Sequence, residues 1–293
     1  MSNKYAAIDI GSNAARLLIG EISSENGHVY VKKISYTRLP LRLGGEVFDT
    51  GEISPQKASD FIKTMKAFAL IADIFNVSAI RACATSAMRD AKNNQFIIDQ
   101  VKEETDIQIE ILSGDEEARL IFGTFALLDI QHENPYLVID VGGGSTEINV
   151  FEHGNRVAAK SFDIGTVRML KDKVDAKEWK SLKEWITSHV EDNPHLVYAT
   201  GGNINKIHKL LGTKEKEPVS IEAMKSLYDV LLPLTIGQRM DRFQLKPDRA
   251  DVIVPALEIF NFCMKTLNCK ELLVPKIGLS DGIVYDLYLK DND

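Results

Sequence analysis

The sequence predicts an α/β protein built from two related domains, and three features lead to that expectation. Its 293 residues exceed the usual size of one domain, so two domains of about 130–150 residues are expected. Strand patterns alternate with helical patterns, which is typical of mixed sheets flanked by helices. A weak repeat aligns residues 5–11 with 136–142 without gaps, and each copy carries an apolar strand, an Asp and a glycine turn. We therefore expect two facing hairpin turns and a site between two lobes.

The first half begins with an apolar strand at 5–10 and a return strand at 17–19. A helix is expected at 54–75, because apolar residues recur there at steps of three and four, with Ser54 placed to cap it and Pro55 at its first position. The further elements expected in this half are a strand at 79–84, a helix at 91–104 and a strand at 107–112.

The second half repeats the hairpin and then becomes mostly helical. A hinge is expected before a polar break at 131–135, so the domains are placed at 1–125, together with a C-terminal helix at about 281–293, and at 126–280. The elements expected after the break are strands at 148–150, 156–162, 196–200 and 270–275, and helices at 166–173, 175–191, 203–212, 220–232, 248–267 and 279–290.

Composition narrows the class of protein. No stretch reaches the roughly 18–20 apolar residues of a membrane span and no signal peptide precedes the first strand, so a cytoplasmic protein without membrane contact is expected. The net charge of −7 argues against nucleic acid as a partner. The three cysteines lack metal-ligand spacing and are expected to be reduced core thiols.

The second hairpin turn places three consecutive glycines, Gly142, Gly143 and Gly144, next to Ser145 and Thr146. Without Cβ atoms, backbone N–H groups can approach an anion closely and point at it together. Such a turn alone is more often structural, but a matching turn in the first half favours phosphate binding. The residues of that first turn are Gly11, Ser12 and Asn13.

Carboxylates stand beside both turns. Asp9 and Asp140 end matched strands and could jointly hold Mg²⁺ through oxygen or water ligands, with Glu147 as a third candidate. The alternative is that each Asp only hydrogen-bonds its own turn, which is less credible for a matched pair.

Two loops carry further candidates. Ser113 and Glu116 have the spacing of a capping box, which gives Glu116 a structural explanation. Asp115 and Glu117 suit the start of a helix, yet three acids in a row exceed what capping needs, so Glu117 is a candidate for the cleft. Arg89 lies in a hydroxyl-rich loop and could bind phosphate or form a surface salt bridge.

Several segments together resemble the exopolyphosphatase/guanosine pentaphosphate phosphatase (Ppx/GppA) family of the actin-like ATPase superfamily, over nearly the whole chain. They are residues 7–13 (AIDIGSN), 84–91 (ATSAMRDA), 111–120 (ILSGDEEARL), 138–147 (VIDVGGGSTE), 165–168 (GTVR), 249–253 (RADVI) and 278–282 (GLSDG). The resemblance implies two ribonuclease H-like (actin-like ATPase) domains, with mixed sheets flanked by helices and the active site in the inter-domain cleft.

The resemblance also implies a hydrolase that removes the terminal phosphate from polyphosphate, guanosine pentaphosphate or both, using a water that Glu117 activates. Asp140 and Glu147 would serve metal and water, and Asp9 would be a further metal-associated acid. Mg²⁺ is the expected cofactor, with Mn²⁺ as a substitute and a monovalent cation as an addition; a homodimer is expected at family level. The residues expected to bind phosphate are Gly11, Ser12, Asn13, Arg89, Gly142, Gly143, Gly144, Ser145 and Thr146.

Three departures from the family pattern bear on these expectations. Ala14 stands where the family usually has Ser, and Ser280-Asp281 stands where Arg-Glu is frequent. The chain ends at residue 293 without the additional C-terminal domains of longer relatives, so high processivity on long chains is not expected.

Two other functions remain open. The same fold also serves small-molecule kinases and ATPases, and residues 200–203 at a strand end could contribute to a nucleotide pocket. A weakly catalytic module that binds polyphosphate or an alarmone is the second alternative. The acid-rich segment around Glu117 favours hydrolysis over the first, and the intact carboxylates favour it over the second.

Overall fold

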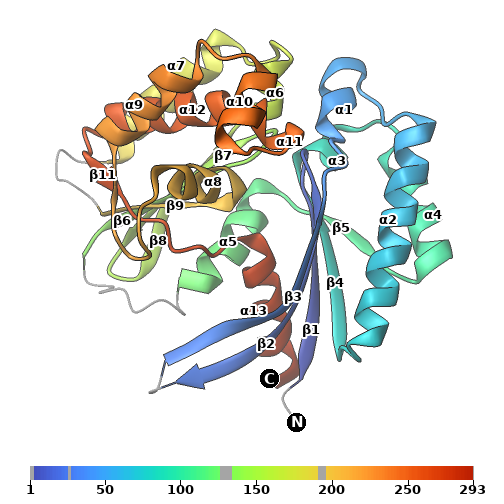
Figure 1. Cartoon of the computed structure of the whole chain (residues 1–293). Coiled ribbons are helices and arrows are strands. Elements are labelled where there is room, and N and C mark those ends of the chain that lie inside the picture. Colours follow the sequence, from blue (N-terminus) through green and yellow to red (C-terminus); the bar gives the residue numbers. More distant parts are fainter. Residues whose placement is uncertain (1–2, 26–27, 126–133, 191–195, 293) are drawn as a thin grey trace. The chain divides into compact units, whose positions relative to one another are not determined.

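The computed structural model describes residues 3–25, 28–125, 134–190 and 196–292 (Figure 1). The chain divides into two compact units, one made of Met1–Ile130 with Ile277–Asp293 and the other of Gln131–Lys276. The hinge expected before residue 131 lies outside the described residues. No helix among the described residues is long and apolar enough to span a membrane.

The first unit is built on a five-stranded mixed sheet with the order β3-β2-β1-β4-β5. β1 pairs antiparallel with β2 and parallel with β4, and β4 pairs parallel with β5. The carboxyl ends of these three parallel strands therefore meet at one edge of the sheet, where ligand sites of α/β folds are commonly found. The strands are β1 (Lys4–Ile10), β2 (Ala15–Glu25), β3 (His28–Leu39), β4 (Ala79–Ala84) and β5 (Ile109–Ile111).

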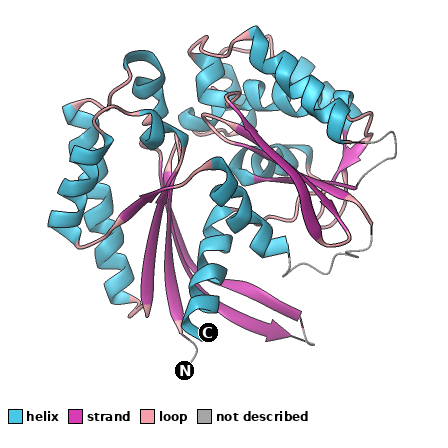
Figure 2. Ribbon diagram, turned by 180° about the vertical axis from the view of Figure 1, so that it is seen from behind, coloured by secondary structure: helices cyan, strands magenta, loops and turns pink. Residues whose placement is uncertain are grey.

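Helices cover both faces of this sheet. Figures 1 and 2 show α2 and α4 on one face and α5 with α13 on the other. α2 starts as predicted, with Pro55 first and the Ser54 hydroxyl accepting from the Lys57 N–H at 3.3 Å. The helices are α1 (Gly44–Thr50), α2 (Pro55–Ile74), α3 (Ser86–Asp90), α4 (Asn94–Thr105), α5 (Gly114–Phe125) and α13 (Leu279–Asn292).

The second unit has a four-stranded mixed sheet with the order β8-β7-β6-β9, in which β6, β7 and β8 are antiparallel and β9 is parallel to β6. The strands are β6 (Tyr136–Val141), β7 (Thr146–Glu152), β8 (Asn155–Phe162) and β9 (Leu196–Thr200), with a small pair, β10 (Val219–Ser220) and β11 (Glu271–Leu272). The helices are α6 (Thr166–Leu170), α7 (Ala176–His189), α8 (Gly201–Leu211), α9 (Ile221–Leu231), α10 (Ile236–Phe243), α11 (Pro247–Ala250) and α12 (Ile253–Thr266).

The two sheets share one plan. In each, a hairpin and a third antiparallel strand are followed by a parallel strand beside the first, giving β3-β2-β1-β4 and β8-β7-β6-β9. The predicted α/β class, with two mixed sheets flanked by helices, is confirmed, and the sequence repeat corresponds to the first strand and turn of each sheet.

Five elements are absent from the sequence prediction, namely β3, α1, α3, β10 and α10. β3 is an edge strand whose residues are all exposed or half-buried. α10 buries none of its residues, yet Ile236, Met240 and Phe243 recur at helical spacing after a Thr235–Gln238 capping box, so its signal was present in the sequence. The helix expected at 248–267 is two helices, α11 and α12, and the strands expected at 107–112 and 270–275 are shorter.

Candidate functional site

The predicted site residues fall into two groups, one in each unit. The first group surrounds the hairpin turn after β1, which closes by a hydrogen bond from the Gly11 N–H to the Ala14 carbonyl at 3.1 Å. The carbonyls of Ser12 and Asn13 accept from the N–H groups of Gly44, at 2.9 Å, and Arg42, at 3.0 Å. In a trans peptide the next N–H points opposite to the carbonyl. The N–H groups of Asn13 and Ala14 are therefore directed away from residues 42–44, the segment that braces the turn.

Gly44 approaches the turn too closely to carry a side chain. A Cβ built there would lie 2.9 Å from the Ser12 Cβ and 2.7 Å from a ring carbon of Phe48. Arg42 has a φ of 57°, so the chain turns sharply just before this contact. Residues 42–44 were not predicted to belong to the site, because nothing in their spacing indicates this close approach.

The loop after β4 lies beside the same turn. The Thr85 N–H donates to the Ile10 carbonyl at 3.1 Å, and the Ser12 and Ser86 hydroxyl oxygens are 3.1 Å apart. One Arg89 nitrogen, Nη1, donates to the Leu112 carbonyl at 2.9 Å, at the end of β5. Predicted residues from two sequence segments, Ser12 and Arg89, thus lie at the carboxyl edge of the first sheet.

Asp9 has a cationic neighbour, Arg16, to which no role was assigned from the sequence. Arg16 occupies the directly opposite position on β2 and forms an ion pair with the Asp9 carboxylate. Asp9 is buried, and its carboxylate contacts the Arg16 guanidinium. The carboxylate is therefore already paired within its own hairpin.

The second group surrounds the glycine turn after β6. Gly142 closes this turn by donating to the Ser145 carbonyl at 2.9 Å. The Gly143 carbonyl accepts from the N–H groups of Val167, at 2.8 Å, and Arg168, at 3.1 Å, while the Gly144 carbonyl accepts from Arg168 Nε at 2.9 Å. The start of α6 therefore holds the carbonyl side of the turn.

The amide side of the glycine turn faces the other way, by the same geometry of the trans peptide. The N–H groups of Gly143, Gly144 and Ser145 donate to no acceptor among the described residues. Successive backbone N–H groups presented in this way form an anion-binding nest. Thr146 differs, because its buried hydroxyl donates to the Ile164 carbonyl at 2.6 Å.

Because residue 165 is a glycine, the start of α6 can approach the glycine turn closely. A Cβ at that position would lie 2.4 Å from the Gly143 carbonyl oxygen, a distance at which the backbone would have to move. Thus the GTVR segment, which carried part of the family resemblance, acts here by close backbone approach.

Asp140 and Glu147 face each other across β6 and β7. The Thr200 hydroxyl donates to Asp140 Oδ2 and the Ser161 hydroxyl to Glu147 Oε1, each at 2.8 Å. Directly opposite side chains have Cβ atoms about 5 Å apart, so two carboxylates here repel unless a cation lies near. Gly201, with a φ of +91°, makes room for Asp140, since a Cβ there would lie 2.5 Å from Oδ1.

This acid pair fits a magnesium ion. No group of three or more His, Cys, Asp or Glu side chains in the described part of the chain is arranged to hold a metal. Mg²⁺ does not need one, because it keeps several waters and commonly takes one or two carboxylates together with substrate phosphates. Asp140 and Glu147 are the residues of the second unit that would hold it.

Residues 200–203, the candidate nucleotide-binding segment, make contacts with other residues of the second unit. Asn203 donates from Nδ2 to the Val141 carbonyl at 2.7 Å and accepts from Arg249 Nη1 at 3.1 Å. The Arg249 guanidinium also lies against Gly202, where a Cβ would be 2.6 Å from Nη2. Arg249 belongs to the RADVI segment and brings a cation next to the start of α8.

Glu117 lies half-buried in the first turn of α5, and its N–H donates to the Ser113 carbonyl at 3.0 Å. The Ser113 hydroxyl accepts from the Glu116 N–H at 3.2 Å, as a cap should. The Glu116 carboxylate, expected to complete a capping box, instead accepts from both Nε and Nη2 of Arg119 at 2.8 Å. This hydrogen bond from Arg119 lowers the pKa of the Glu116 carboxyl.

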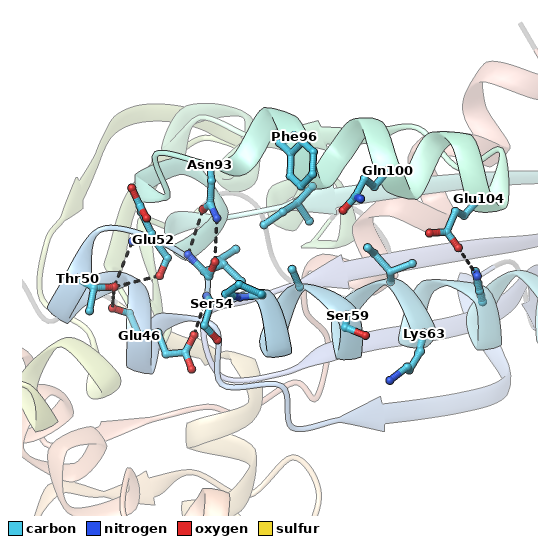
Figure 3. Close-up of a pocket in the computed structure, with 16 residues that line it drawn as sticks. Glu46, Thr50, Glu52, Ser54, Ser59, Lys63, Asn93, Phe96, Gln100 and Glu104 are labelled. Atoms are coloured by element: carbon cyan, nitrogen blue, oxygen red, sulfur yellow. Dashed lines mark hydrogen bonds and ion pairs between the residues drawn. The ribbon is translucent and has the colours of Figure 1, made fainter.

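A cavity of about 910 Å³ lies elsewhere in the first unit, between α2 and α4 (Figure 3). Its lining combines Phe96 and Ile62 with Lys63, Glu46 and Glu104. None of the predicted site residues lines it. The residues predicted to carry the chemistry therefore lie outside this cavity.

Comparison with known proteins agrees with these observations. The model of the Ppx/GppA phosphatase family matches residues 22–291. "Exopolyphosphatase 1" of Mycobacterium tuberculosis is 24% identical over 302 residues, which cover 96% of this chain and 87% of that protein. A "bifunctional 3-dehydroquinate synthase/phosphatase" of Fusobacterium nucleatum is 33% identical over 279 residues, covering 85% of this chain and 41% of its own length.

Among solved structures, the Ppx/GppA family member from Aquifex aeolicus matches with a TM-score of 0.79 and 25% identity, covering both chains completely. The structural similarity therefore extends over both units.

Proposed function

The chain belongs to the Ppx/GppA phosphatase family, and from that premise we propose that it removes the terminal phosphate from polyphosphate or guanosine pentaphosphate. The observation that carries this proposal is the glycine turn of the second unit. Its carbonyls are held by α6, and the N–H groups of Gly143, Gly144 and Ser145 are presented together to an anion. Exopolyphosphatase relatives at 23–24% identity support the substrate class.

In this proposal the amides of the glycine turn hold the oxygens of the terminal phosphoryl group. Within the first unit, the N–H groups of Asn13 and Ala14 and the Arg89 guanidinium are also proposed to bind phosphate oxygens. Because Ala14 acts through its backbone, the absence of the usual serine there leaves this contact intact. Fixed donors of this kind stabilise the charge that spreads over the phosphoryl oxygens in the transition state.

Asp140 and Glu147 are the proposed ligands of Mg²⁺, with Asp9 more remote from that role because Arg16 already pairs with it. When bound, the ion offsets the charge of the phosphate oxygens. The positive charge of the ion would explain how a chain with a net charge of −7 binds a polyanion.

Glu117 is the proposed general base. It accepts a proton from a water whose oxygen forms a new bond to phosphorus, while the bridging P–O bond breaks in line. The shortened chain leaves with the bonding electron pair as a terminal phosphate. Orthophosphate is the second product, so atoms and charge balance without another reactant.

Release of orthophosphate should be measured side by side on long polyphosphate, tripolyphosphate, guanosine pentaphosphate and ATP, with Mg²⁺ and with excess chelator. We expect Mg²⁺-dependent release from polyphosphate or guanosine pentaphosphate and much less from ATP. Turnover of ATP alone would contradict the proposal and support the kinase or ATPase alternative. Tight binding of polyphosphate without release would support the binding-module alternative.

A further inference from the structure

Four charged side chains of the first unit form a closed ring near the start of α5. Arg81 on β4 contacts Asp286 of α13 at 2.6 Å and Glu116 of α5 at 3.5 Å. Arg119 of α5 contacts the same two acids, Asp286 at 2.9 Å and Glu116 at 2.8 Å. Each arginine therefore touches both acids and each acid touches both arginines.

The ring is balanced in charge and partly shielded from water. Arg81 is 8% exposed and Asp286 is 11% exposed at its side chain. Two further groups bind from outside the ring. Glu110 of β5 pairs with Arg81 at 2.8 Å, and Lys290 pairs with Asp286 at 3.0 Å. Three cations thus meet three carboxylates, so the ring adds no net charge beside the acid-rich start of α5.

The packing around the ring leaves α5 little freedom. Gly282 of α13 lies so close to α5 that a Cβ on it would be 2.1 Å from the Leu120 carbonyl oxygen. The ring links α5 to α13 one helical turn away from the contact between Gly282 and Leu120. Through Arg81 it also links both helices to β4. Glu116, the ring member in the first turn of α5, is followed directly by Glu117.

We propose that the ring of Arg81, Glu116, Arg119 and Asp286 is a positioning device that holds the first turn of α5, and with it the Glu117 carboxylate, in the geometry needed for water activation. The catalytic part of this inference rests on the proposed function. Three consecutive acids repel one another at the start of α5, and the two arginines bind the middle one from two directions. A misplacement of about 1 Å in a catalytic group can cost about a hundredfold in rate, so such fixing has a kinetic consequence.

The test compares Asp286→Asn with Glu110→Gln. Both substitutions remove one carboxylate charge that binds Arg81, but only Asp286 belongs to the ring. Arg119→Lys is the second ring variant; its parent side chain is half exposed, so the fold should survive, while a lysine cannot match the fork that contacts both acids. For each variant, hydrogen exchange of the peptide 113–125 is measured together with kcat and KM.

For Asp286→Asn and Arg119→Lys we expect faster exchange at the start of α5, a kcat lower by roughly tenfold to a hundredfold, and a KM within about twofold of wild type. Glu110→Gln should change neither exchange nor kcat. Equal losses in Glu110→Gln would show a general weakening of the unit and overturn the proposal. Faster exchange with unchanged kcat would also overturn it, because the ring would then hold the helix without serving catalysis.

The exchange measurement separates this inference from the proposed function. If wild type releases no phosphate from any of the four substrates, the proposed function fails. Faster exchange in the ring variants alone would then still support the ring as the support of α5. Unchanged exchange in both ring variants would overturn the ring inference whatever the activity.

Discussion

The residues that face the two strand-end aspartates differ in charge. Arg16 stands opposite Asp9, whereas Glu147 stands opposite Asp140. The sequence repeat already aligns Arg16 with Glu147, because each follows its Asp by seven positions (16 − 9 and 147 − 140). The difference could therefore have been predicted from the sequence, and it favours Asp140 and Glu147 over Asp9 as magnesium ligands.

Substituting the three acids should reveal this difference in the metal requirement. We expect Asp140→Asn and Glu147→Gln each to raise the Mg²⁺ concentration for half-maximal activity by roughly tenfold or more, because each removes half of the acid pair. Asp9→Asn should shift it by much less. Titrating activity with Mg²⁺ for the three variants checks this expectation, and an equal or larger shift for Asp9→Asn would contradict it.

The role of Glu116 could not be predicted from its neighbours in the sequence. Its spacing from Ser113 predicts a capping box, and the Ser113 half of that prediction is confirmed. The carboxylate binds Arg119, which is nearby, and Arg81, which belongs to a distant strand. Only the tertiary packing of α13 brings Asp286 into the same cluster.

At the level of elements, each proposed phosphate turn is braced by a segment that follows it. Residues 42–44 hold the first turn and residues 165–168 hold the second, both by hydrogen bonds to turn carbonyls. The glycines of the turns were evident from the sequence. The glycines of the bracing segments were not, because their use depends on a close approach between strands and loops that spacing does not encode.

Adjacent glycines at the start of α1 provide a matched test of this bracing. Gly44→Ala would place a Cβ 2.9 Å from the Ser12 Cβ, whereas a Cβ at Gly45 would meet nothing within 4 Å. We expect Gly44→Ala to cost about 1–3 kcal/mol of unfolding free energy and to raise KM by displacing the first turn. Gly45→Ala should be neutral or slightly stabilising. Denaturant unfolding and substrate kinetics measure both, and equal behaviour of the two variants would contradict the bracing role.

At the level of the whole molecule, the α/β class and the repeated sheet plan were predictable because strand and turn patterns recur in both halves. The helical caps were predictable where side chains act locally, as at Ser54. The edge strand β3 was missed because its residues are all exposed or half-buried, whereas α10 carried a helical period and a capping box that the sequence prediction overlooked. Motifs in both units identify the family. These motifs do not distinguish polyphosphate from guanosine pentaphosphate as the substrate, because both present a terminal phosphoanhydride.

Hydrolysis by a water that Glu117 activates is the central proposal, and single-turnover phosphate release by Glu117→Gln tests it most directly. The substitution removes a charge and a basic site but keeps the size of the side chain, so binding and melting temperature should remain close to wild type. We expect the rate of phosphate release to fall by roughly 10²–10⁴, the usual range for loss of a general base. A Glu117→Gln variant that binds substrate and releases phosphate at the wild-type rate would contradict the proposed mechanism.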